Sequence, residues 1–369
     1  MKNASWVERS VAGAGWVLLA LRLCTVVAST LVLRNANSNL NTMIDGELVS
    51  TLTGNVVFEY DDVTIRSGYA RWRRSREVVD LRDDVKVTRG EQALSCDRMH
   101  YDGREETLSA RGNVRFRDNA EQVEVSGRRC TYDLRTRHCV LAGDPVFTRL
   151  DTAAAETLTI KARRMNYDDS AKVTTARDEV RITKGQLNAR CEEARYYTER
   201  EVAMLRTSPD IAYGEHELRG DSVDLVFRGD TLEAAEVVGN ARGFYVERAE
   251  GDTTRTYVRG DSIFMALTDA GFLDSVYVCR NVRSIHVSRG DSLRGDEVTG
   301  RNMVLAFGEK GSVRAAQVVG NARSLYYLEE GEGEGTNEAG GDTLSVWFSK
   351  GEAVRLRLSG GVRGVYSPR

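Results

Sequence analysis

The chain has 369 residues, enough for two domains of ordinary size, and its formal net charge is -3. The near balance of 52 basic and 55 acidic residues excludes a general electrostatic attraction to nucleic acid. The chain contains only three prolines, which suits a protein that is mostly hydrogen-bonded sheet, because proline lacks the N–H that a sheet ladder uses.

Residues 1–36 predict an N-terminal membrane anchor or a signal peptide. A short polar start that contains Lys2 and Arg9 precedes an apolar stretch over residues 11–33, which is interrupted by Arg22. The stretch is long enough to cross a bilayer as one helix, and the basic start favours a cytoplasmic N-terminus. A signal peptide cleaved near residues 26–28 is the alternative, and both interpretations predict export.

A short motif recurs along the rest of the chain, and its first copy is Gly54-Asn55-Val56. Close copies lie at residues 112–114, 239–241 and 320–322, and looser copies lie at 83–85, 143–145, 178–180, 209–211, 280–282 and 360–362. The spacing is about 30 residues in the first half and about 40 in the second. Such self-similarity indicates stacked copies of one supersecondary unit.

The segments between the copies are typical of β-hairpins. Residues 94–101 and 107–116 alternate between apolar and polar side chains, and Asp102-Gly103 between them is a turn sequence. We interpret the Asn or Asp before each Val as a turn former at the start of a strand. No stretch after Leu40 keeps a helical period. The predicted fold is therefore all-β.

One face of each predicted strand is apolar and the other carries charges such as Arg115 and Arg181. A single apolar face must close on itself or on a second sheet. We therefore predict an elongated, open β-jelly-roll of stacked hairpins, preceded by one N-terminal apolar helix; a solenoid would also satisfy the pattern. The change of spacing divides the sheet into segments 37–215 and 216–369. The predicted inward set is Val56, Phe58, Val85, Val87, Val114, Phe116, Val180, Ile182, Ile211 and Tyr213.

The chain shows no constellation that predicts catalysis, a metal or a cofactor. Its four histidines are far apart in sequence, and nucleophile-elbow, P-loop and Rossmann motifs are absent. Five Arg-Gly-Asp copies accompany the repeat, so we interpret them as part of it. Cys130 and Cys139 flank a predicted hairpin turn and could pair across it in an oxidising compartment. Cys96 and Cys191 fall at inward positions and are interpreted as small buried hydrophobes.

The repeat resembles a known family. The pattern Leu94-x-Cys-Asp-x-x-x-Tyr, a turn, and then Leu108-x-Ala-x-Gly-Asn-Val-x-Phe is similar to the OstA/LptA-like repeat of lipopolysaccharide-transport proteins. The similarity runs from about Glu47 to Tyr366. It implies a β-jelly-roll that is open at its ends and joins similar modules edge to edge. The N-terminal segment is similar to that of the inner-membrane-anchored member, although members of that type carry a shorter exported region.

The resemblance implies a non-enzymatic periplasmic protein, tethered through residues 11–33, that shields lipopolysaccharide acyl chains between the two membranes. The expected partners are lipopolysaccharide or a similar multi-acyl lipid, other transport proteins paired at edges near 51–58 and 354–365, and the membrane, but no nucleic acid. The inward set would bind the lipid, because each buried methylene is worth about 0.8 kcal/mol. The alternatives are an exported structural or adhesive β-solenoid and a polysaccharide-acting β-helix enzyme.

Overall fold

The computed structural model describes residues 31–60, 62–120, 122–151, 156–168, 170–197, 199–228, 231–249, 252–288, 295–308, 312–328, 335–349 and 352–368. The chain divides into two compact units. Unit 1 comprises residues 1–185 and 192–200, and unit 2 comprises residues 186–191 and 201–369. Strand β14 (Leu187–Tyr197) contributes residues to both.

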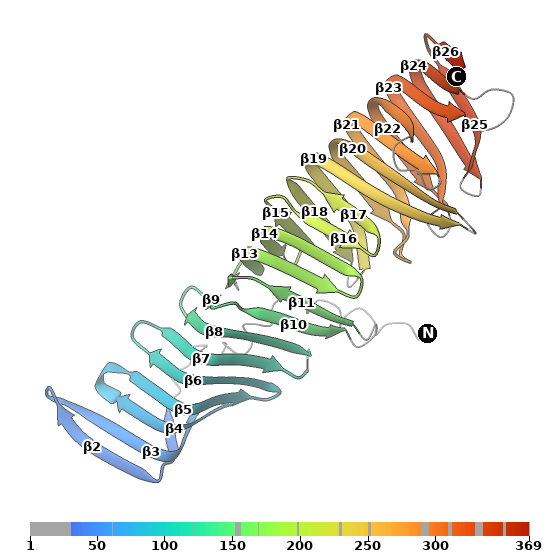
Figure 1. The fold of residues 1–369 in the computed structure, drawn as a ribbon. Coiled ribbons are helices and arrows are strands. Elements are labelled where there is room, and N and C mark those ends of the chain that lie inside the picture. Colours follow the sequence, from blue (N-terminus) through green and yellow to red (C-terminus); the bar gives the residue numbers. More distant parts are fainter. Residues whose placement is uncertain are drawn as a thin grey trace, which may run out of the picture. The chain divides into compact units, whose positions relative to one another are not determined.

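Unit 1 is an antiparallel sheet in which most consecutive strands form hairpins (Figure 1). One 3-10 turn, η3 (Arg74–Arg76), follows β4. The strands are β1 (Val32–Asn35), β2 (Ser38–Ile44), β3 (Glu47–Tyr60), β4 (Val63–Arg73), β5 (Val78–Arg89), β6 (Gln92–Asp102), β7 (Thr107–Asp118), β8 (Val123–Asp133), β9 (His138–Ala142), β10 (Val146–Asp151), β11 (Glu156–Lys161), β12 (Arg164–Asp168) and β13 (Val173–Lys184).

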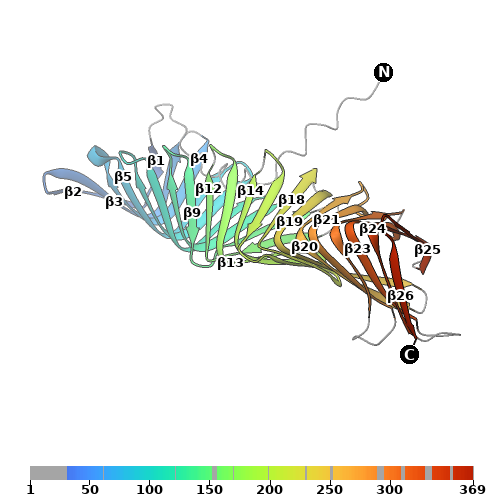
Figure 2. The same cartoon turned by 90° about the horizontal axis from the view of Figure 1, so that it is seen from above.

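Unit 2 is also an antiparallel sheet, and its longer strands follow one another in chain order from β19 to β24 (Figure 2). Its strands after β14 are β15 (Val202–Arg206), β16 (Asp210–Tyr213), β17 (His216–Arg219), β18 (Ser222–Arg228), β19 (Thr231–Ala249), β20 (Asp252–Leu267), β21 (Leu273–Ser288), β22 (Asp296–Phe307), β23 (Val313–Leu328), β24 (Gly335–Ser349), β25 (Glu352–Ser359) and β26 (Arg363–Pro368).

The all-β prediction is confirmed for the described chain. The predicted N-terminal helix falls almost wholly on residues 1–30, which lie outside the described residues, but Val32 and Leu33 at its end belong to strand β1. Among the described ranges, no helix has the length and apolar character needed to cross a membrane. The contact-based division near residue 200 and the predicted division after 215 rest on different criteria, so the latter stays a prediction.

At seven of its ten places the recurring motif is a β-bulge inside one long strand. In β3, Gly54 and Asn55 both have positive φ, and together they oppose the single residue Gly68 of β4. Such a two-against-one insertion bends the strand and increases its twist. Outside hairpin turns, consecutive residues with positive φ occur at 54–55, 83–84, 112–113, 143–144, 178–179, 207–208, 239–240, 280–281, 320–321 and 360–361.

The places of the motif were predicted correctly for all copies but one. The predicted role, a strand start, is wrong at seven pairs, where the chain continues the same strand, whereas a new strand does begin after 143–144, 207–208 and 360–361. Asn, Asp and Gly suit the bulge since they tolerate the left-handed region better than other residues. The copy predicted at 209–211 is also misplaced, because the bulge is Thr207-Ser208. Pro145 and Pro209 directly precede β10 and β16, as the missing N–H requires.

A carboxylate on the neighbouring strand accepts hydrogen bonds from several bulge asparagines. Asn113 Nδ2 lies 3.1 Å from both carboxylate oxygens of Asp97, and Asn281 Nδ2 lies 2.9 Å from Asp261 Oδ1. Asn240 reaches Asp221 in the same way, at 3.1 and 3.2 Å. Asp221 and Asp261 end two of the Arg-Gly-Asp copies. These copies therefore support the repeat, as the sequence indicated.

The bulges divide each sheet into two halves. Half A consists of the strand segments that come before a bulge in the chain, together with the segments that pair with them. Half B consists of the strand segments that come after a bulge, together with the segments that pair with those. In unit 1, Phe58 of half B contacts Trp72 of half A edge to face, with ring centroids 5.5 Å apart. In unit 2, Tyr245 of half B contacts Phe307 of half A, with centroids 6.4 Å apart. In both units, then, the inner faces of the two halves meet.

The edge strands differ from those predicted at the N-terminal end. Residues 51–58 belong to β3, which pairs with β4 on one side and with β1 and β2 on the other, so this segment is not an edge. The strands beyond it are β1 and β2, whose residues are almost all exposed. At the other end, β25 and β26 pair with β24, and their described residues are largely exposed, which agrees with the prediction near 354–365.

Candidate lipid-binding interior

The inward side chains of half B are placed by their distance from the bulge. We number them 1, 3 and 5, counting from the second bulge residue, because alternate residues of a strand share a face. In β3 positions 1 and 3 are Val56 and Phe58, and in β19 positions 1, 3 and 5 are Ala241, Gly243 and Tyr245.

Unit 1 buries large apolar groups at positions 1 and 3. Val56, Val85 and Val114 at position 1 are at most 2% exposed, and Phe58 at position 3 is 1% exposed. The chain itself covers these side chains. A lipid that touched them would therefore displace contacts between halves A and B. The buried members of the predicted inward set are Val56, Phe58, Val85, Val87, Val114, Phe116, Val180 and Ile211.

Two predicted inward residues lie differently. Ile182 is half-buried. Tyr213 is 59% exposed, because the bulge before it is Thr207-Ser208, which puts Tyr213 at position 5, near the end of its strand, and Ile211 at position 3. The same register identifies Phe147 as a position 3 residue that the sequence prediction omitted.

The basic and aromatic cluster around Trp72 has a structural role in unit 1. The Trp72 ring meets Phe58 in the interior, and the guanidinium of Arg74 lies 4.2 Å from the indole centroid. Arg73 pairs with Asp80 at 3.1 Å. Because the indole packs between these groups, it is not presented as a stacking surface on the outside of the sheet.

Unit 2 has different residues at the equivalent positions. From β19 onward, position 3 is small and position 5 is aromatic: Gly243 and Tyr245, Ser284 and His286, Ser324 and Tyr326, Gly364 and Tyr366. Half A of unit 2 remains apolar, with Ile263, Val278, Met303, Val318 and Leu344 buried. The sequence prediction missed the aromatic column, although counting residues forward from each bulge motif would have found it.

The polar side chains of this interior interact with one another. His286 and Asp296 are directly opposite on β21 and β22, and Thr256 Oγ1 lies 2.9 Å from His286 Nδ1. Burial lowers the pKa of His286, while the Asp296 carboxylate acts in the opposite direction. Burial, with the same carboxylate, raises the pKa of Tyr326 to about 12, so its hydroxyl keeps its proton at neutral pH.

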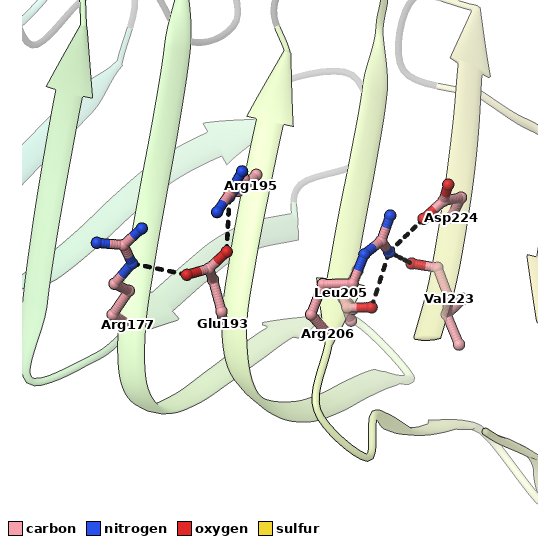
Figure 3. Close-up of polar contacts among 7 residues, drawn as sticks. All are labelled: Arg177, Glu193, Arg195, Leu205, Arg206, Val223 and Asp224. Carbon is pink, nitrogen blue, oxygen red and sulfur yellow. Dashed lines mark hydrogen bonds and ion pairs between the residues drawn. The ribbon is translucent and has the colours of Figure 1, made fainter. Parts of the chain in front are cut away.

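Charged groups on the outer faces form short networks that are typical of sheet surfaces. In unit 1, Glu193 accepts hydrogen bonds from Arg177 at 2.7 Å and from Arg195 at 2.6 Å (Figure 3). In unit 2, Arg206 bonds the Asp224 carboxylate and the carbonyl oxygens of Leu205 and Val223 (Figure 3). These carboxylates are occupied by guanidinium groups, so they are not placed as a general acid and base.

Four of the five thiols in the described residues are buried, and Cys279 is exposed. Cys96 and Cys191 are buried, as predicted, and burial raises the pKa of Cys96 to about 12. Cys130 and Cys139 are free and buried, with their Sγ atoms 3.7 Å apart. The hydrogen bond with Cys130, together with burial, holds the pKa of Cys139 well above its ordinary value, so it is a protonated thiol. Within the described ranges, no group of three or more His, Cys, Asp and Glu side chains is arranged to hold a metal ion.

Comparison with known proteins agrees with the motif. Residues 35–173 match the family model described as LptA/(LptD N-terminal domain) LPS transport protein. Among solved structures, the chain is similar to LptH, the LptA-homologous periplasmic component of the lipopolysaccharide transport device from Pseudomonas aeruginosa. That match has 13% identity and a TM-score of 0.27, covers 30% of this chain and 79% of the LptH chain, and is too weak to support a functional inference. No curated protein matches significantly.

Proposed function

We propose that this chain is a non-enzymatic protein that shields lipopolysaccharide acyl chains in the periplasm, because residues 35–173 match the family model described as LptA/(LptD N-terminal domain) LPS transport protein. The observation that carries the proposal is the continuous apolar row of half B in unit 1, which runs through Val56, Phe58, Val85 and Val87 to Val114 and Phe116.

The energetics favour such a row as a lipid path. Exposing an acyl chain to water costs about 0.8 kcal/mol for each methylene, so a lipid with several chains cannot cross an aqueous space bare. In the structure the row is covered by half A, and an entering chain would exchange one apolar contact for another. The two halves are joined covalently through the bulges, where an extra residue already interrupts the ladder, so we place the opening movement there.

The edges supply the second part of the proposal. The exposed β1 and β2 at one end and β25 and β26 at the other would pair with edge strands of other transport proteins. Leu40 of β2 and Val365 of β26 are both more than 60% exposed and would be covered by such pairing. Residues 11–33 would tether the chain to the inner membrane or direct its export before cleavage.

Photo-crosslinking in cells tests the lipid path. Benzoylphenylalanine at Phe58 or Phe116 keeps the phenyl ring and adds a benzoyl group to it, and Arg115 and Arg117 on the outer face of β7 are the matched controls. We expect the inward positions to label lipopolysaccharide and the controls to remain unlabelled. Equal labelling from both faces would overturn the proposal.

The packed interior of unit 1 favours one alternative, an exported structural β-solenoid. In that case the buried row holds the fold together and never meets lipid. Lipid extraction and mass spectrometry of the purified chain distinguish the two functions. A transport protein retains acyl lipid, and substitutions of inward residues lower the ratio of lipid to protein. A structural protein retains no acyl lipid. Crosslinkers at Leu40 and Val365 test the edges, and capture of no protein at either site would contradict edge pairing.

A further inference from the structure

Four arginines stand side by side on the outer face of unit 1, in half A beside the bulges. Arg82 of β5 is opposite Arg98 of β6, and Arg98 in turn is opposite Arg111 of β7. Arg129 of β8 is opposite Arg111 and completes the set on four adjacent strands (Figure 1). Each arginine is exposed and is next in sequence to a buried inward residue, so its side chain lies on the outer face. We call these four residues the arginine row.

The arginine row carries charge that the chain does not neutralise. Arg98, Arg111 and Arg129 form no ion pair with any described residue. Arg82 reaches Asp83, but the distance of 3.9 Å is long for an ion pair. Neighbouring strands are about 4.8 Å apart, so the row places its four guanidinium groups along a line of about 14 Å. Like charges directly opposite each other destabilise a sheet, and an anion bound along this line would offset the repulsion.

The bulge architecture does not require this row, because unit 2 carries uncharged residues at the equivalent positions. The outer residues directly before its bulges, and the residues opposite them, are Val238, Ser262, Cys279, Asn302 and Val319. The arginine row is therefore a property of the surface of unit 1.

A second basic row runs parallel to the first, on the half B side of the bulges. Arg66 of β4 is opposite Lys86 of β5, and Arg115 of β7 lies two strands further along the same row. Arg66 forms no ion pair within the described chain, whereas Lys86 pairs with Asp84 and Arg115 pairs with Glu124. The arginine row therefore supplies most of the free positive charge, and the second basic row widens the surface.

The acids near the two rows are engaged or lie apart from them. Asp97 accepts hydrogen bonds from Asn113, and Asp84 pairs with Lys86 at 2.9 Å. The acids at the hairpin ends of β5–β8 are Glu77, Glu91, Asp102, Glu105, Glu106, Asp118 and Asp133. A flat anionic membrane on this face would also meet these acidic ends and be repelled by them. A narrow anionic chain that crosses the strands along the rows would meet the basic middle and avoid the ends.

The surface suits sugars better than the bases of a nucleic acid. Tyr69 of β4 continues the arginine row, opposite Arg82, whose guanidinium covers the ring at 3.7 Å from its centroid. Single-stranded nucleic acids gain affinity by stacking bases on open aromatic rings, and the ring of Tyr69 is not open to a base. Ser95 and Ser126 lie within the second basic row and supply hydroxyl groups that can hydrogen-bond sugar hydroxyls.

We propose that the two rows bind a linear anionic glycan, a sugar chain that bears carboxylate or phosphate groups, across the strands on the outer face of unit 1. Guanidinium groups suit both anions, since their paired N–H donors match two oxygens at once. The site lies on the opposite face of the sheet from Phe58 and Phe116, so it is separate from the lipid path and does not depend on it.

Titration calorimetry of the full chain with defined sugar chains tests the proposal. An oligogalacturonate long enough to span the row carries a carboxylate on each sugar, and a maltodextrin of the same length is the neutral analogue. We expect the oligogalacturonate to bind, the maltodextrin not to bind, and added salt to weaken the binding. The double variant Arg98→Gln/Arg111→Gln should bind the oligogalacturonate about tenfold more weakly, because two charge-assisted contacts are lost.

Two arginines in hairpin turns supply the matched control. Arg104→Gln/Arg135→Gln removes the same charge from exposed residues outside both rows and should keep the wild-type affinity. Absence of oligogalacturonate binding, or an equal loss in the two double variants, would overturn the proposal. Tighter binding of oligothymidylate, or of phosphatidylglycerol vesicles, that depends on Arg98 and Arg111 would assign the surface to another partner and would also overturn it. Lipid crosslinking from Phe58 should be the same in all variants.

Discussion

Units 1 and 2 share one construction device and differ in what they enclose. Both interrupt long antiparallel strands with a bulge of two positive-φ residues, and both bring side chains of halves A and B into contact. Unit 1 fills half B with large apolar groups, whereas unit 2 combines small and aromatic residues there. The comparison shows that the bulge determines the architecture of the sheet. The residues at positions 3 and 5 after it can differ, and they determine the size and polarity of the side chains in the interior.

The largest expected difference concerns position 3. Phe58→Ala in unit 1 removes a buried ring that contacts Trp72 and should cost about 3–5 kcal/mol of unfolding free energy. Ser324→Ala at the same position in unit 2 should cost less than about 1 kcal/mol, since its hydrogen bond to the Ala339 carbonyl is long, at 3.5 Å.

Denaturation can be monitored by the hydrogen exchange of peptides from β3–β4 and from β23–β24. This measurement assigns each loss of unfolding free energy to unit 1 or to unit 2. Equal losses for the two variants would show that unit 2 is packed like unit 1, and the comparison would fail.

The bulge should respond equally in both units. Gly112→Ala and Gly239→Ala each place a Cβ within 2.3 Å of an aspartate oxygen, at φ values of 75° and 77°, and each should cost about 2–3 kcal/mol. Gly46→Ala is the control, because it has the same positive φ but nothing within 4 Å of the new Cβ. It should cost only about 1 kcal/mol in the same thermal or chemical denaturation. If Gly46→Ala loses as much unfolding free energy as the two bulge variants, the cost comes from the positive φ alone and not from the contact with aspartate.

Acidification should weaken unit 2 through His286. Burial, opposed by Asp296 of β22, lowers the pKa of this imidazole below its ordinary value of 6.5, and Thr256 of β20 is its other polar neighbour. Below about pH 6.5 His286 therefore binds a proton more readily in the unfolded chain than in the folded chain. The free energy of unfolding keeps its full value above that pH and falls as the pH drops through the pKa of the folded state.

His286→Gln should flatten this dependence between pH 8 and 5.5, with a residual slope from His216, whose pKa burial also lowers. Hydrogen exchange of β20–β22 peptides at several pH values measures it. An unchanged slope in the variant would exclude His286 as the source.

The smallest expected effects come from the outer charged pairs of the two units. Arg177→Gln in unit 1 and Arg206→Gln in unit 2 should each cost less than about 1 kcal/mol, because partly exposed ion pairs gain little over solvation. Neither should change lipid crosslinking from Phe116. A strong loss of crosslinking in either variant would move the binding surface from the interior to the outer face.

Sequence reasoning located nearly all the bulges but misread the role of the seven that lie inside a strand. Alternation on either side of Gly112-Asn113 indicates strands, yet nothing local distinguishes a turn before a strand from a bulge inside one. The partner strand decides, because a bulge exists only where the pairing register between two strands shifts, as it does opposite β6 between Arg111 and Val114. The error at 207–208 has a similar cause, since Thr and Ser are unusual left-handed residues and Pro209-Asp210 resembled the motif more closely.

By itself, the sequence determined the all-β class, the repeat, the apolar row of unit 1 and the similarity of residues 35–173 to a transport family, because strand alternation and turn chemistry are local properties. Only the tertiary structure decided that Thr51–Phe58 is an interior strand and that Tyr213 is exposed. It also brought Gly243, Ser284 and Tyr326 into adjacent rows of one interior. Such rows depend on the cross-strand register, and each bulge shifts this register by one residue. The accumulated shift over several strands cannot be read from the residue pattern of a single strand.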